Sequence, residues 1–250
     1  MTKRMTGLCL LLVLLCACGK RTETYTIATD AVTPPFSFPG GADGAHCVGI
    51  DPELLDAIAE NQGFRYKLKL MSVQEAVRAV ERGEVDGVLS AVSITARRRE
   101  TLQFSDVYYR SHIVLAVPAG NVQIQTLEDL AGKTVAVRSG SQAAAYAEMV
   151  AETYRFNVVS FSTMAQTYAD VGVASDACID DYSLLGYSIL QGSGLYITDT
   201  LEQTAEYALA VGKADTDRAL LDSFNAGLVA LQEDGTYDSI LKKYVAAPVT

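Results

Sequence analysis

Arg98 is the third residue after Thr95, a spacing that can build an anion-binding site. Thr95 is a favourable helix N-cap, so the backbone N–H groups after it would point outward from a helix N-terminus. Arg98 can turn its guanidinium to the same spot, and an arginine fork beside a positive helix end is a receptor for a carboxylate. The alternative is that Arg98 is one solvated cation in the arginine run 97–99.

Two further segments carry groups of complementary chemistry. Gly140, Ser141 and Gln142 stand at the start of another expected helix and offer more backbone N–H donors to the same anion. Asp181 follows an apolar, strand-like run and would face a cleft, where its carboxylate could bind an ammonium group. Asp181 or Asp180 could instead be the N-cap of the helix expected over 182–190.

The elements that must position these residues alternate between strands and helices, as in an α/β fold. The pattern predicts strands over 24–29, 66–70, 85–89, 113–117, 134–137, 157–161, 172–179 and 207–211. It predicts helices over 51–60, 72–83, 127–130, 141–154, 182–190 and 216–232. The order indicates two lobes, with the chain crossing over mid-way and returning at the end. A cleft between such lobes is where a small ligand would sit.

The composition narrows the possible partners. The 250 residues are 49% hydrophobic and 20% charged, which is ordinary for a globular protein. Thirty acidic against twenty basic residues give a net charge of −10, so nucleic acid is an unfavourable partner. His46 and His112 have no neighbours at ligand spacing. We therefore expect no metal site and no cofactor.

The N-terminus has the layout of a bacterial lipoprotein signal. A basic start precedes the apolar run 8–15, which is shorter than a membrane-spanning helix. Cys18 follows the small Ala17, whereas Cys16 follows the bulky Leu15 and is the poorer candidate for lipidation. We expect an extracytoplasmic protein held to the membrane by a lipid anchor alone, in the periplasm or on the outer face of the cytoplasmic membrane. An ordinary secretory signal is the alternative.

Removal of the signal and lipidation of Cys18 would leave Cys47 and Cys178. Cys178 lies in an apolar run and is expected in the core. A disulfide between the two is the less favoured alternative.

Several segments, taken together and in order, resemble the bacterial extracellular solute-binding proteins of family 3, the amino-acid receptors of ABC importers. These segments are residues 30–38, 49–54, 85–109, 127–141, 176–181 and 234–237. The resemblance extends over essentially all of 24–244. It implies the two-lobed, type II periplasmic-binding-protein-like fold, with a ligand cleft between the lobes and two crossover hinge strands.

The resemblance also implies a division of the chain. We expect a signal peptide over 1–17 and a lipid-anchored linker over 18–23. Lobe 1 would comprise 24–107 plus 208–250, and lobe 2 would comprise 113–203. The hinges would lie at about 108–112 and 203–207.

By the same resemblance, Arg98 would hold the α-carboxylate of an amino acid and Asp181 its α-amino group. Four residues would assist through backbone or hydroxyl groups: Ala91, Ser93, Ser141 and Gln142. The positions that usually clamp the ligand side chain are Thr33 and Val73 here, which makes the pocket less aromatic, while Phe36 is expected in the core.

The distal end of the pocket would contain Asp30, Arg138 and Asp180. An acid and an arginine together suit a neutral polar group such as a carboxamide. An acidic side chain would be repelled by the two aspartates, and a large apolar one would leave polar groups unpaired. We therefore expect a polar, uncharged amino acid of glutamine-like size, with a cationic amino acid second.

The predicted function is that of a monomeric receptor that closes over an amino acid and delivers it to the permease subunits of an ABC importer. A sensory protein of the same fold would use the same closed lobes. A cyclohexadienyl or arogenate dehydratase is disfavoured, because such enzymes resemble the receptor with an added proton donor, typically a glutamate, and positions 180 and 181 are aspartates. No catalytic residue is therefore assigned.

Overall fold

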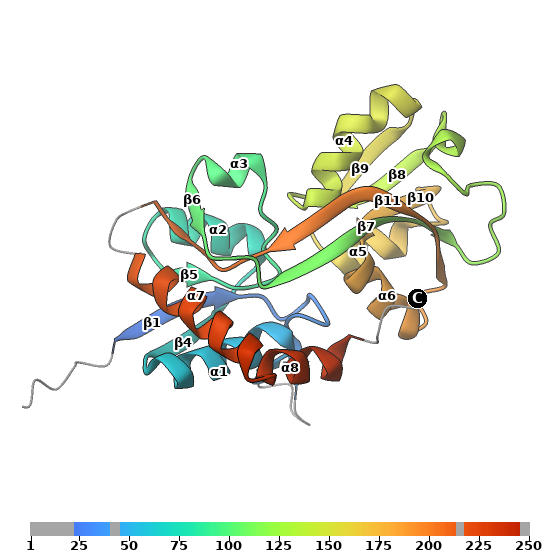
Figure 1. Ribbon diagram of the computed structural model, residues 1–250. Helices are drawn as coiled ribbons and strands as arrows, with labels where there is room; N and C mark the ends of the chain where they lie inside the picture. Colours follow the sequence, from blue (N-terminus) through green and yellow to red (C-terminus); the bar gives the residue numbers. More distant parts are fainter. Residues whose placement is uncertain (1–22, 41–45, 214–217, 246–250) are drawn as a thin grey trace, which may run out of the picture.

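The computed structural model describes residues 23–40, 46–213 and 218–245. Two α/β lobes lie side by side, each around its own five-stranded sheet (Figure 1). The predicted signal peptide and the linker up to residue 22, Cys18 included, lie outside the described residues. Among the residues described, no helix is long and apolar enough to cross a membrane.

Lobe 1 is built on a sheet with the strand order β4-β1-β5-β12-β6. Its strands are β1 (Thr24–Thr29), β4 (Arg65–Leu70), β5 (Gly87–Val88), β6 (Leu102–Phe104) and β12 (Ala210–Gly212). Its helices are α1 (Ile50–Gln62), α2 (Val73–Glu81), α3 (Ala96–Arg99), α7 (Arg218–Glu233) and α8 (Thr236–Tyr244). A small hairpin pairs β2 (Phe38–Gly40) with β3 (His46–Val48).

Lobe 2 is built on a sheet with the strand order β11-β7-β10-β8-β9. Its strands are β7 (Tyr109–Pro118), β8 (Thr134–Arg138), β9 (Asn157–Phe161), β10 (Ala177–Asp181) and β11 (Leu195–Tyr207). Its helices are the 3₁₀ turn η1 (Leu127–Leu130), α4 (Gln142–Tyr154), α5 (Met164–Asp170) and α6 (Tyr182–Leu190).

The chain passes between the lobes along β7 and β11, which run antiparallel across the middle of the molecule (Figure 1). Their pairing extends from Leu195 opposite Pro118 to Tyr207 opposite Tyr109. Tyr207 also forms an isolated bridge with Ser93 of lobe 1. The long strands therefore connect the lobe 2 sheet directly to the loop that precedes α3.

Local sequence signals explain several of these elements. The Ser72 hydroxyl caps α2 by accepting a hydrogen bond from the backbone N–H of Glu75. The Glu75 carboxylate in turn accepts a hydrogen bond from the backbone N–H of Ser72. This is the capping box that the sequence predicts. Phe36 and Cys178 are fully buried in the core, as expected. Cys47 and Cys178 are both free thiols, so the alternative of a disulfide between them is wrong.

Several parts of the chain differ from the sequence expectation. The strand expected over 172–179 begins later in the structure, where β10 spans Ala177–Asp181. A turn at Gly172 (φ 86°) interrupts the apolar run and leaves Val173 83% exposed. The strand expected over 207–211 is divided between the end of β11 and β12. Helix α5 and most of β11 escaped prediction, and β11 is an edge strand whose polar residues mask its period.

Candidate ligand-binding cleft

A small cavity lies between the lobes. Five of the predicted ligand-binding residues line it, namely Asp30, Thr33, Val73, Arg98 and Arg138, whereas Asp180 and Asp181 do not. Lobe 1 contributes residues from the end of β1, the start of α2 and Arg98, and lobe 2 contributes the ends of β8 and β9 with the start of α5. The lining residues are Asp30, Val32, Thr33, Ser72, Val73, Gln74, Arg98, Arg138, Ser139, Ser162, Thr163 and Met164. The cavity measures about 30 Å³, room for about two water molecules. An amino acid can enter only if the lobes separate or side chains move.

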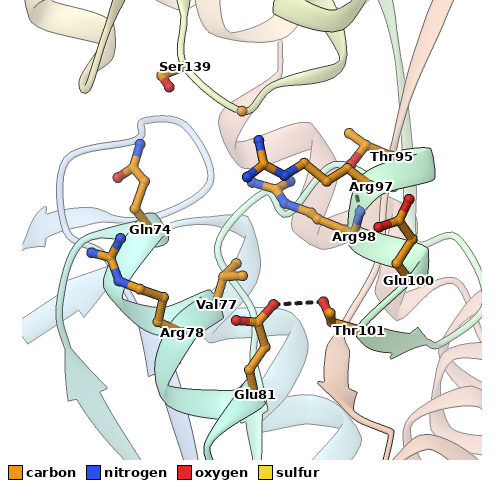
Figure 2. A pocket seen from close by; sticks show the side chains of 11 residues that line it. Gln74, Val77, Arg78, Glu81, Thr95, Arg97, Arg98, Glu100, Thr101 and Ser139 are labelled. Atoms are coloured by element: carbon orange, nitrogen blue, oxygen red, sulfur yellow. Dashed lines mark hydrogen bonds between the residues drawn. The ribbon is translucent and has the colours of Figure 1, made fainter.

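Arg98 extends from α3 toward lobe 2. The Thr95 hydroxyl accepts a hydrogen bond from the Arg98 backbone N–H at 3.2 Å, so Thr95 caps the helix as predicted. The guanidinium Nη1 donates to the Ser93 carbonyl at 2.7 Å, and a Cβ at Gly140 would lie 3.7 Å from Nη2. Figure 2 shows this side chain pointing into the space below Ser139. Burial, followed by the charge of Arg138, lowers the pKa of Arg98 to about 10, which keeps it cationic at neutral pH.

Asp180, Asp181 and Arg138 form a buried charge cluster in lobe 2. Strands β8 and β10 are parallel neighbours, so their carboxyl ends lie side by side. Arg138 Nη2 is 3.3 Å from Asp181 Oδ2 and 3.6 Å from Asp180 Oδ1. Asp180 also accepts hydrogen bonds from the Tyr168 hydroxyl at 3.0 Å and from the Asp181 N–H at 2.9 Å. Asp181 precedes α6 without making a side-chain cap bond, and it is fully buried and does not line the cavity.

The cluster changes the acid–base properties of its members. Burial, with a contribution from Asp180, raises the pKa of Asp181 to about 7, although Arg138 opposes the shift. Burial would lower the pKa of the Arg138 guanidinium, but the charges of Asp180 and Asp181 raise it. Arg138 therefore remains cationic, whereas Asp181 takes up a proton at a higher pH than an exposed aspartate does.

Four buried polar atoms around the cluster have no hydrogen-bond partner among the residues that the structure describes. They are Ser93 Oγ, Arg138 Nε, Asp181 Oδ1 and the Tyr207 hydroxyl. Buried polar groups are normally hydrogen-bonded, since leaving one unsatisfied costs about 1–3 kcal/mol. Of the residues that carry these atoms, only Arg138 lines the cavity between the lobes.

Asp30, by contrast, already has its partners. Its carboxylate accepts hydrogen bonds from the Thr33 hydroxyl at 2.7 Å, the Ser37 hydroxyl at 3.0 Å and the Val32 N–H at 3.3 Å. Thr33 therefore holds the carboxylate with its hydroxyl while it lines the cavity. Val73 lines the cavity from the first turn of α2.

The other predicted contributors differ in their availability. The Ala91 N–H donates to Asp51 Oδ2 at 2.8 Å, so this amide is already used. The Ser93 carbonyl is occupied by Arg98, and its hydroxyl is free. Ser141 is the N-cap of α4 and accepts from the Ala144 N–H at 3.0 Å. Ser141 and the half-buried Gln142 lie beyond the cavity wall, where Ser139 stands instead.

Asp51 is a residue whose importance the sequence did not reveal. It is 1% exposed and binds both the Ala91 N–H and the Tyr108 hydroxyl, the latter at 2.6 Å. Ala91 has a positive φ of 44°, unusual for a residue with a side chain, and Asp51 holds this strained turn in place. Burial raises the pKa of Asp51 to about 7. Asp51 lies in the first turn of α1, where acidic residues are common, so the sequence did not indicate that it would be buried.

The site residues suit a zwitterion better than a metal ion. No group of three or more His, Cys, Asp or Glu side chains that could hold a metal occurs among the described residues. An arginine fork on lobe 1 and an unpaired carboxylate oxygen on lobe 2 match the two ends of an α-amino acid.

Comparison with known proteins shows the family of the chain. The chain matches the family model of the bacterial extracellular solute-binding proteins, family 3, over residues 25–247. It is 30% identical to the arginine-binding extracellular protein ArtP of Bacillus subtilis over 224 residues, covering 87% of this chain and 84% of the relative.

Two solved structures are also similar. An ancestral arginine-binding protein bound to glutamine superposes with a TM-score of 0.79 at 30% identity, covering 91% of this chain and 100% of the other. The second substrate-binding domain of Lactococcus lactis GlnP, in an open conformation, gives a TM-score of 0.65 at 32% identity, with coverages of 92% and 98%. The chain belongs to the bacterial extracellular solute-binding proteins of family 3.

Proposed function

We propose that this protein is the lipid-anchored receptor of an amino-acid ABC importer, and that it binds its ligand by closure of the two lobes. The observation that carries the proposal is the placement of Arg98 on one lobe and the unpaired Asp181 Oδ1 on the other. A zwitterion satisfies both only when the cleft is shut.

The α-carboxylate would bind the Arg98 guanidinium, with the free Ser93 hydroxyl beside it. The α-amino group would bind Asp181 Oδ1 and the Tyr207 hydroxyl. Burial and the charge of Asp181 raise the pKa of Tyr207, so the phenol remains protonated. Charge-assisted hydrogen bonds of this kind contribute about 1.5–3 kcal/mol each.

For the ligand side chain we propose a polar, uncharged amino acid of glutamine-like size. Asp30 and Asp180 already accept hydrogen bonds from hydroxyl groups, so a cationic side chain would have to share these carboxylates with the present donors. Arg138 retains an unsatisfied Nε donor at the cavity wall, which suits the carbonyl oxygen of a carboxamide. A cationic amino acid is the second candidate, and ArtP is a relative named for binding arginine.

The remaining assignments concern the environment of the receptor. Cys18 would carry the lipid after removal of residues 1–17, with 18–23 as the linker, and would keep a monomer outside the cytoplasmic membrane, where it meets the permease. Lobe 1 would comprise 24–107 with 208–250 and lobe 2 would comprise 113–203. The segments 108–112 and 203–207 would act as hinges, and β7 pairs with β11 there.

The experiment that tests the proposal is a thermal-shift screen against the twenty amino acids, followed by calorimetry. A ligand at 100 times its dissociation constant should stabilise the protein by about 2.7 kcal/mol. Arg98→Ala should raise the dissociation constant of that ligand at least a hundredfold, because the ligand carboxylate loses its charge-assisted, bidentate contact. The circular dichroism spectrum of the variant should be unchanged, since Arg98 is not among the buried core residues. An unaltered dissociation constant would refute the assignment of Arg98.

A further inference from the structure

A second and larger cavity adjoins the cleft on the far side of Arg98 (Figure 2). It measures about 440 Å³ and shares Gln74, Arg98 and Ser139 with the 30 Å³ cavity. Helices α2 and α3 form one wall, and the Ser139–Gly140 loop of lobe 2 forms the other. Whatever fills this space therefore contacts both lobes and touches the guanidinium assigned to the ligand carboxylate.

The charges around this cavity are unusual for so acidic a chain. Arg78, Arg97 and Arg98 all line it, and none of them is ion-paired with a carboxylate of the described residues. Figure 2 shows Arg97 reaching into the hollow beside Arg98, and Arg78 standing on α2 across from them. Two carboxylates also line the cavity, Glu81 and Glu100.

The Glu81 carboxylate accepts a hydrogen bond from the Thr101 hydroxyl at 2.6 Å and keeps its negative charge, so three arginines face two carboxylates around this cavity. The third member of the arginine run behaves differently from Arg97. The guanidinium carbon of Arg99 lies over the ring of Phe104, 6.0 Å from its centroid, and Arg99 does not line the cavity. Arginine forks are the side chains best suited to bind a second carboxylate.

We propose that this cavity binds the second residue of a dipeptide whose first residue occupies the amino-acid cleft. The free amino group is then held at Asp181, the peptide carbonyl faces Arg98, and the terminal carboxylate is bound by Arg97 and Arg78. The volume falls within the range of about 300–1,000 Å³ that small-molecule pockets span. The inference rests on the proposed function, because it uses the same Asp181 and Arg98 contacts.

The test is a calorimetric comparison of three kinds of probe. The first is the free amino acid (glutamine, arginine or lysine), the second is its dipeptide with C-terminal glycine, and the third is that dipeptide as its C-terminal amide. We expect at least one dipeptide to bind at least tenfold more tightly than its amide, which lacks only the terminal carboxylate.

Substitutions then locate the contact. In the double variant Arg78→Ala/Arg97→Ala the dipeptide should lose about tenfold in affinity and the amide less than twofold, while free amino acids change less than twofold. Arg99→Ala is the matched control, because Arg99 is a neighbouring cation that does not line this cavity. It should leave the affinities for all three probes unchanged. Both arginines are exposed, and their loss removes no core contact.

The outcomes separate this inference from the proposed function. Free amino acids that bind through Arg98 while no dipeptide binds would overturn the inference and leave the proposed function intact. Equal affinity for dipeptide and amide, or an unchanged preference in the double variant, would also overturn it. Failure of amino acids and dipeptides alike would overturn both.

Discussion

At the scale of single residues, the proposed ligand ammonium would compete with Arg138 for Asp181. One of its oxygens is held by Arg138 at 3.3 Å, and the other has no partner among the described residues. A ligand ammonium can occupy the free oxygen, but it then shares the carboxylate with a cation that belongs to the protein. Arg138 offsets part of the repulsion between the two adjacent aspartates, and it also reduces the negative potential available to a ligand.

The raised pKa of Asp181 predicts a pH-dependent affinity. An ammonium group needs the ionised carboxylate, and the pKa of Asp181 is about 7 before ligand binds. We expect affinity to fall below about pH 7, approaching tenfold for each pH unit, because the protonated form must first ionise. Calorimetric titrations between pH 5.5 and 8 measure this slope. Asp181→Asn should bind more weakly and lose the slope, and an equally steep slope in that variant would show that another group titrates.

The stability of the unliganded protein should change with pH in the opposite sense. The folded pKa of about 7 lies above the unfolded value of about 3.9, so the fold binds protons more tightly than the unfolded chain. The stabilising contribution of protonated Asp181 is present below about pH 4 and is lost as the pH rises through 7. Asp51 adds a contribution of the same sign, because its pKa is raised to about 7 as well.

At the scale of elements, close contacts between helices hold the binding loops in place. Helix α1 carries Asp51, which fixes the Ala91 turn, and α1 packs against α7. The approach is close at Gly227, where a Cβ would lie 2.7 Å from Ile58 Cγ2 and 3.2 Å from Gln62 Cγ. Only glycine permits this separation. Gly186 of α6 is also helical, but a Cβ there would meet nothing within 4 Å.

These two glycines make a matched pair of substitutions. Gly227→Ala should destabilise the protein by about 1–3 kcal/mol, because α7 must move away from α1. Gly186→Ala should stabilise it by up to about 1 kcal/mol, because alanine favours the helix and has room there. Urea unfolding midpoints measure both changes. A Gly227→Ala protein as stable as the wild type would contradict the close packing described for α1 and α7.

At the scale of the whole molecule, the two lobes are already close together. The side chain of Gln74 on α2 donates a hydrogen bond to the Ser162 carbonyl of lobe 2 at 3.4 Å across the cleft mouth. The fold also superposes better on the ligand-bound ancestral arginine-binding protein than on the open GlnP domain. The 30 Å³ cavity implies that ligand enters a more open arrangement.

Ligand should therefore shift the protein toward a more compact state. A molecule that contacts both lobes only when they are closed must favour closure by its differential affinity. We expect small-angle scattering to give a smaller radius of gyration at saturating ligand than without it. Identical profiles would contradict closure as the binding mechanism.

Anchoring also belongs to the whole molecule. Cys18→Ser should release the protein from the membrane fraction or block removal of the signal peptide, because the serine cannot form the thioether to lipid. Fractionation with metabolic lipid labelling measures this, with Cys16→Ser as the matched control that should remain anchored and labelled. Lipid label retained by Cys18→Ser and lost by Cys16→Ser would reassign the anchor.

The sequence alone predicted the α/β class, the two-lobed fold and the capping of α2, because apolar periodicity and cap residues act over a few neighbouring positions. Family resemblance predicted that Arg98 and Asp181 bind the two ends of the ligand. Only the tertiary structure showed which of the donors and acceptors of the predicted site residues are already occupied within the protein. The partners of Asp30, the double ion pair of Arg138 and the burial of Asp51 depend on segments far apart in the chain. Local patterns contain no information about which strand ends meet. The edge strand β11 escaped prediction for a different reason, because its polar residues hide the alternation typical of a strand.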